Sequence, residues 1–213
     1  MRISIVLALS AVFVFSFCDT AIAKGSEIGQ SLINPASPMY FLKSVEEILE
    51  VKFVTNNKDQ GLKQIDLAKR RLEEVKSLIM IDRGDLVSPT LEKYWSSLSK
   101  FLNYTTFIDD RLKYEVLDQV GKHIILLEDS YYRTDNQKAR ISIRAVLSKV
   151  PSWNLQFIEK LNNFQKTQLS AKIKSNQNLI CDFLSKEASS SALNQTERAV
   201  LLERGQKCFK ISQ

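Results

Sequence analysis

Glycine and proline are scarce in this chain, with six glycines and four prolines among 213 residues. Sandwiches and barrels with many tight turns, and Rossmann-type folds with glycine-rich phosphate loops, use more of both. The scarcity therefore argues against these fold classes. Hydrophobic residues make up 44% and charged residues 25% of the chain, as in ordinary folded domains, which argues against wholesale disorder.

Histidine and cysteine are also rare. One histidine excludes a multi-histidine metal centre, and three cysteines exclude a dense disulfide scaffold. The chain contains no Gly-x-Ser-x-Gly, no Cys-x-x-Cys and no glycine-rich phosphate loop. We therefore expect no cofactor, no metal site and no catalytic residue, and we predict that the protein is not an enzyme.

A long apolar run is found at the N-terminus, where Ile3 to Phe17 spans 15 uncharged residues. That is shorter than the roughly 20 residues that a membrane-spanning helix needs. Arg2 precedes the run and Ala21-Ile22-Ala23 follows it, which is typical of a secretory signal peptide over residues 1–23. The sequence therefore predicts a secreted or periplasmic protein. Two alternatives stay open: an uncleaved N-terminal membrane anchor, and lipidation at Cys18, which the bulky residue before it disfavours.

The rest of the chain predicts an all-α fold, a bundle of about six to seven mostly antiparallel helices. A polar flexible arm over 24–36 leads to a helical domain over 37–150 and a helical hairpin over 151–213. Ser37-Pro38 and Ser88-Pro89 each place a capping hydroxyl before a proline, which predicts helix starts. Asn194 and Glu197 form a capping-box pattern before the last helix.

The helical periodicity also predicts which side chains face the core. In the first helix we expect this face to be the apolar stripe Phe41, Leu42, Val45, Ile48, Leu49 and Phe53. In the second helix the basic run Lys69-Arg70-Arg71 is interleaved with acids and predicts a solvated face, and Asp66 lies four residues before Arg70 in the favourable order. One long helix is predicted from Trp153 to about Lys186, with an exposed polar middle over Gln165–Gln177.

Cys181 and Cys208 remain once the signal peptide is removed, and they fall on the two arms of the predicted hairpin. In an exported protein two such cysteines predict a disulfide. Two separately buried thiols are the alternative.

The first predicted helix opens on Ser37-Pro38-Met39-Tyr40-Phe41-Leu42-Lys43. This run is similar to the Ser-Pro-x-Tyr-x-Leu-Lys opening of a bacterial family catalogued as domain of unknown function 5667, which the chain resembles over about residues 34–150. The family's second helix has a counterpart here in Ala68, Arg71, Leu72 and Glu74, and a later helix in His123 and the apolar residues after it. Thr134-Asp135-Asn136 replaces a Pro-Glu pair that is common there. The resemblance implies export or membrane anchoring and a helical fold, with no established activity.

Three functional hypotheses follow. The first is a non-enzymatic protein-interaction or structural module that binds a protein partner in the bacterial cell envelope. The second is a peripheral protein that binds anionic membrane or cell-wall surfaces, because the net charge is +6 and Lys166, Lys172 and Lys174 lie in an acid-poor stretch. Nucleic acid is not an expected partner of an exported protein. The third is a hydrolase or metal-binding protein that uses His123 and nearby carboxylates such as Asp109, although a lone helical histidine is more often a packing residue.

Overall fold

The computed structural model describes residues 29–190 and 193–211, and for residues 206–211 it describes the backbone alone. The described residues form α-helices joined by short turns and two 3₁₀ helices, and contain no strand, which confirms the predicted all-α fold. The elements, in chain order, are α2 (Tyr40–Phe53), α3 (Asn57–Met80), η1 (Gly84–Leu86), α4 (Val87–Phe101), η2 (Leu102–Phe107), α5 (Asp110–Arg133), α6 (Gln137–Leu147), α7 (Val150–Glu159), α8 (Asn163–Ala188) and α9 (Gln195–Ile211).

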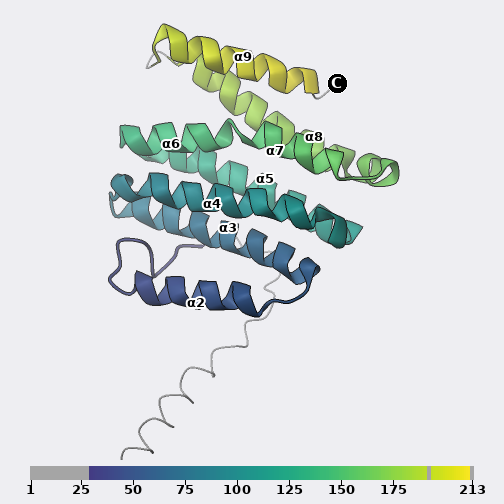
Figure 1. Cartoon of the computed structure of the whole chain (residues 1–213). Helices are drawn as coiled ribbons and strands as arrows, with labels where there is room; N and C mark the ends of the chain where they lie inside the picture. Colours follow the sequence, from purple (N-terminus) through teal and green to yellow (C-terminus); the bar gives the residue numbers. More distant parts are fainter. Residues whose placement is uncertain (1–28, 191–192, 212–213) are drawn as a thin grey trace, which may run out of the picture.

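The helices stack in successive layers, with α2 at one end of the stack and α9 at the other (Figure 1). Close backbone packing joins α3 to α4, α5 to α8 and α8 to α9. The helix α2 differs from these, because its backbone scarcely approaches any other described element. Long side chains must therefore span the gap between α2 and the rest of the bundle.

One continuous apolar core runs through the stack. Its aromatic centre is formed by Phe101 of α4 with Trp153 and Phe157 of α7, whose rings stack with centroids 5.4 to 6.4 Å apart. The indole nitrogen of Trp153 donates to the carbonyl oxygen of Leu98 at 2.8 Å, so this large ring is buried without losing a hydrogen bond. The core therefore links the middle of the chain to its C-terminal half.

Several helix boundaries follow the polar punctuation of the sequence. The Asp109 side chain accepts from the Leu112 amide and starts α5, and Asn136 does the same for α6. The predicted capping box before the last helix is confirmed, since the Asn194 side chain accepts from the Glu197 amide at 2.8 Å and the Glu197 carboxylate accepts from the Asn194 amide at 3.2 Å. These side chains satisfy amides that the first helical turn leaves unpaired.

The helix starts predicted from the two serine–proline pairs are wrong in detail. Ser37 lies in a turn before α2, where its hydroxyl accepts from the Met39 amide at 3.3 Å, and the helix itself begins at Tyr40. Ser88 lies inside the first turn of α4, because η1 already begins the helical path at Gly84. Proline fits any position of a first helical turn, so it locates a helix start only to within a few residues.

The single helix predicted from Trp153 to about Lys186 is also wrong, because the chain breaks between α7 and α8. Asn162 starts α8 with a capping box, in which its side chain accepts from the Gln165 amide and the Gln165 side chain accepts from the Asn162 amide. The polar middle of the predicted helix is not all exposed, since Asn176 and Gln177 are buried. Asn176 donates to the carbonyl oxygen of Leu117 on α5 at 2.7 Å, so polar groups there serve helix packing.

No helix in the described ranges is long and apolar enough to cross a membrane. The predicted signal peptide and Cys18 lie outside the described residues, as does the Cys208 side chain.

Candidate interaction surface on α2

The inward side of α2 is polar. Tyr40, Lys43 and Glu47 of α2 meet Arg71 and Glu74 of α3 in one bonded cluster, which we call the α2 clasp. Lys43 Nζ lies 2.7 Å from Glu74 Oε1, and Arg71 Nη1 lies 2.7 Å from both Glu74 oxygens. Arg71 also pairs with Glu47 and donates to the Tyr40 hydroxyl at 2.6 Å. The clasp thus contains two cations and two anions, which neutralise one another.

The clasp is shielded from water. The side chain of Glu74 is fully buried, and those of Arg71 and Glu47 are nearly so. Burial, followed by the nearby Glu74 carboxylate, raises the pKa of Tyr40 to about 12, so its hydroxyl stays protonated and donates to Glu74. Buried charges are tolerated when they are paired and hydrogen-bonded. Each charge of the clasp has a partner of opposite sign, although Glu47 Oε1 accepts no hydrogen bond from the described residues. The clasp therefore determines which side of α2 faces the bundle.

A second set of ion pairs flanks the clasp at the surface. Arg70 lies 3.1 Å from Glu50 of α2 and 3.0 Å from Asp66, which confirms the predicted Asp66–Arg70 contact. Lys63 reaches Glu50 at 2.6 Å. The prediction that Lys69-Arg70-Arg71 forms a solvated face is wrong for Arg71, because Glu47 and Tyr40 of α2 cover it.

The motif residues of the family resemblance fall into separate groups. The clasp brings together Tyr40, Lys43, Arg71 and Glu74. On α3, Ala68 and Leu72 point into the apolar core of the bundle. Ser37 and Pro38 form the turn before α2, whereas Leu42 is exposed and His123 lies on α5. Sequence reasoning missed Glu47, Glu50 and Arg70 as docking residues. The acidic run in the first helix and the basic run in the second could have indicated them, since the two are complementary.

The outward side of α2 is apolar, opposite to the prediction that this stripe faces the core. We call it the α2 outer face, formed by Phe41, Leu42, Val45, Ile48, Leu49 and Phe53. Phe41 is 71% and Phe53 79% exposed, and the other four are between 38% and 56% exposed. The stripe is exposed because the polar side of α2 has matched partners on α3.

The α2 outer face is large for a soluble protein. The two phenylalanines expose about 300 Å² if each side chain has roughly 200 Å² of surface. The four half-exposed aliphatic residues add a similar area, so the total is on the order of 600 Å², at the upper end of what a monomer exposes in one patch. Patches of this size mark binding surfaces.

His123 does not contribute to an accessible site. It is buried on α5 with its ring edge-on to Tyr94 of α4, at 5.7 Å between centroids. Burial, helped by the charge of Lys69, lowers the pKa of His123 to about 3, so the ring is neutral near pH 7. Asp109 lies 14 residues earlier on the exposed start of the same helix, about 21 Å away along its axis. The structure does not bring these two residues together.

The remaining carboxylates are also spread out. Asp110 lies near Lys113 and Gln165, and Asp129 pairs with Arg133 in the next turn of α5. Among the described residues, no group of three histidine, cysteine, aspartate or glutamate side chains is arranged to hold a metal ion.

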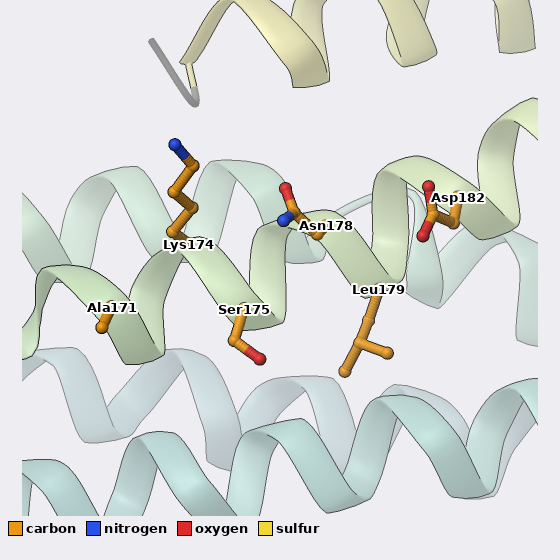
Figure 2. Close-up of a pocket in the computed structure, with 6 residues that line it drawn as sticks. All are labelled: Ala171, Lys174, Ser175, Asn178, Leu179 and Asp182. Carbon is orange, nitrogen blue, oxygen red and sulfur yellow. The ribbon is translucent and has the colours of Figure 1, made fainter.

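A shallow pocket of about 480 Å³ lies on α8, lined by Ala171, Lys174, Ser175, Asn178, Leu179 and Asp182. Figure 2 shows that all six come from this one helix and that Lys174 and Leu179 point in opposite directions. Lys174, Asn178 and Asp182 follow one another at successive turns, so the pocket is a strip along one helix. The predicted basic stretch is weaker than its sequence indicates, because Lys172 pairs with Asp118 of α5 at 2.5 Å.

At the far end of the stack a polar cluster holds α8 and α9 to α5 and α6. Glu187 of α8 is buried and accepts from the Tyr131 hydroxyl, and Arg144 lies 3.1 Å from Glu187 and 3.3 Å from Glu197. Cys181 is fully buried on α8, which packs against α9, the helix that carries Cys208.

The comparisons with known proteins identify a family. The family described as "Domain of unknown function (DUF5667)" matches residues 32–198. The match covers more than half of the chain and extends beyond residue 150, where the resemblance seen in the sequence ends. No curated protein and no solved structure matches the chain. Both helices of the clasp lie within the matched residues, and the chain belongs to the DUF5667 family.

Proposed function

We propose that the protein is an exported, non-enzymatic interaction module of the bacterial cell envelope, and that it binds a protein through the α2 outer face. The observation that carries this proposal is the orientation of α2. Lys43 and Glu47 are used inside the clasp, and the six large apolar side chains of α2 face outward. An apolar surface held on a rigid element favours association, because little conformational entropy is lost on binding.

The distribution of polar groups supports a binding role over a catalytic one. Glu47, Arg71 and Glu74 are buried and, together with Lys43, form a neutral cluster, so none of them is directed at a solvent-accessible cavity. His123 is buried and uncharged at neutral pH. A general base needs both access to substrate and a pKa near the working pH.

Photo-crosslinking in the intact envelope tests the proposal. A photoreactive amino acid at Val45, on the α2 outer face, is expected to give protein crosslinks. The matched control is Ile125, a half-exposed apolar residue on α5. Crosslinks from Val45 should disappear when Leu49→Glu places a charge on the face. Equal labelling from the two positions, or Val45 crosslinks that survive Leu49→Glu, would refute an interaction through this face.

Export is the second part of the proposal, and it rests on the signal-peptide pattern in residues 1–23. Expression of the full chain in a bacterial host should deliver a product that begins at Lys24, as determined by mass spectrometry of the extracytoplasmic fraction. A cytoplasmic product that keeps residues 1–23 would contradict export, and a membrane-bound product that keeps them would indicate an anchor.

We further propose that Cys181 and Cys208 form a disulfide between α8 and α9. Closing a loop of this length stabilises the fold by about 3–4 kcal/mol in the chain-entropy model. Non-reducing mass spectrometry of the exported protein should find the two cysteines in one crosslinked peptide pair. Alkylation of both thiols without prior reduction would exclude the bond.

Binding to an anionic membrane or wall surface is the second candidate function. Lys174 is exposed at the pocket on α8, and the chain carries a net charge of +6. If this candidate holds, co-sedimentation with anionic vesicles should fall with added salt and with Lys174→Ala. Vesicle binding that changes with neither salt nor Lys174→Ala would exclude this candidate function.

A further inference from the structure

The α2 outer face lies where another molecule can reach it without rearrangement. Figure 1 places α2 at one end of the stack, with α3 and α4 on one side of it. The clasp fixes the rotation of α2, so the face is already directed outward before anything binds. What remains to be identified is the occupant.

The charge around the face disfavours a lipid surface. Helices that lie on anionic membranes carry lysines and arginines beside their apolar side. Here Lys43 is used by Glu74 inside the clasp. Lys52 and Glu46 are both exposed. On a helical projection Lys52 falls within the apolar stripe, between Phe41 and Val45, and Glu46 lies at its edge beside Phe53, so the two charges cancel. A neutral apolar face with a polar rim has the composition of a protein–protein interface.

The size and symmetry of the face match a second copy of the chain. Two such faces would bury on the order of 1,200 Å², the lower limit of a standard stable interface. A two-fold axis needs a surface that is complementary to itself. If two α2 helices pair antiparallel about the centre of the helix, Phe41 of one copy lies beside Phe53 of the other, and Val45 lies beside Leu49 of the other.

We propose that the α2 outer face is the interface of a two-fold symmetric homodimer. This rests on the proposed interaction through α2 and names its partner as a second copy of this chain. The clasp takes no direct part in the interface, but it holds both copies of the helix in the orientation that pairing requires.

Sedimentation equilibrium of the purified exported protein, at concentrations up to about 100 µM, tests this proposal. The wild type is expected to form a dimer. Leu49→Glu should weaken it by roughly 30-fold or more, the effect of a residue at the centre of an interface. The control Ile125→Glu should leave the dimer unchanged, and circular dichroism should show equal helix content in all variants.

A charge-swap rescue separates face-to-face pairing from a general effect of the substitution. Val45→Lys and Leu49→Glu should each be monomeric alone, and their mixture should recover the dimer, because the lysine of one copy then lies beside the glutamate of the other. A dimer that survives Leu49→Glu, or no recovery in the mixture, would overturn the proposed interface.

A wild type that stays monomeric throughout would overturn the second copy as partner. If its Val45 crosslinks to another protein then depend on Leu49, the interaction function stands and only the partner assigned here fails. If it instead floats with vesicles in a Leu49-dependent way, a lipid surface is the occupant. If neither occurs, the proposed function fails as well.

Discussion

Removing Glu74 should destabilise the protein strongly, because its carboxylate is the acceptor that the cations of the clasp share. Its side chain is fully buried and accepts from Arg71, Lys43 and Tyr40. Deleting one partner of a buried ion pair typically costs about 3–5 kcal/mol, because the other charge is left uncompensated. Arg71 keeps its contact with Glu47, and Lys43 is partly exposed and can turn toward water. We therefore expect Glu74→Ala to cost about 3 kcal/mol, at the lower end of that range.

The neighbouring acid provides a matched control. Glu73 is partly exposed and lies 4.0 Å from Lys69, so Glu73→Ala should cost less than about 1 kcal/mol. Urea unfolding followed by circular dichroism near pH 7 measures both free energies of unfolding. A cost below about 1 kcal/mol for Glu74→Ala, or one no larger than that of Glu73→Ala, would refute the account of the clasp given above.

The same variant should also release α2 locally. Few apolar side chains of α2 are buried, so the helix depends on the clasp for its attachment. Limited proteolysis of Glu74→Ala should therefore cut the link between α2 and α3, residues 54–56, faster than in the wild type. Cleavage at the wild-type rate would mean that α2 is held by something other than these ion pairs.

Two further predictions concern α5 and α9. At Gly121 a Cβ atom would lie 2.6 Å from Oδ1 of Asn176, so we expect Gly121→Ala to lower the free energy of unfolding by about 1–2 kcal/mol. At Gly205 the added carbon makes only an ordinary contact, so Gly205→Ala should raise the free energy of unfolding by up to about 1 kcal/mol. Urea unfolding measures both variants. A lower free energy of unfolding for Gly205→Ala, or a higher one for Gly121→Ala, would contradict the packing described. Because burial lowers the pKa of His123 to about 3, the unfolded state takes up this proton first, and stability should fall as the pH drops from about 6.5 toward 3, by up to about 1.4 kcal/mol per pH unit from this residue. The one imidazole in the chain allows a direct NMR test, in which a titration midpoint near 6.5 in the folded protein would exclude this burial effect.

Helix boundaries can be predicted reliably from local signals where a side chain forms a cap. Asn194 and Glu197 satisfy each other's amides, and this depends only on residues three apart. The break at Asn162 has the same signal with Gln165, but the apolar residues on either side fit one helical stripe and obscured it. Serine–proline pairs located helix starts less well, because proline is accepted at several positions of the first turn.

The orientation of α2 could not be predicted from its own pattern. An amphipathic stripe indicates that one side of a helix differs from the other, and the usual assumption places the apolar side inward. Here the polar side carries Tyr40, Lys43 and Glu47, whose partners lie some 24 to 34 residues away in sequence on another helix. Only the tertiary pairing with Arg71 and Glu74 decides which side of α2 faces the bundle. The candidate surface therefore became visible with the structure.

The division of α2 into two sides separates the residues that attach the helix to the fold from the surface proposed to bind. Substitutions at Phe41 or Phe53, the most exposed residues of the outer face, remove little buried area, so they change the chemistry of the exposed surface at small cost to the fold. Substitutions of clasp residues act in the opposite way, since they alter the attachment of the helix and leave the outer side chains unchanged. The chemistry of the exposed surface can therefore be redesigned independently of the domain's stability, as long as the clasp residues are kept.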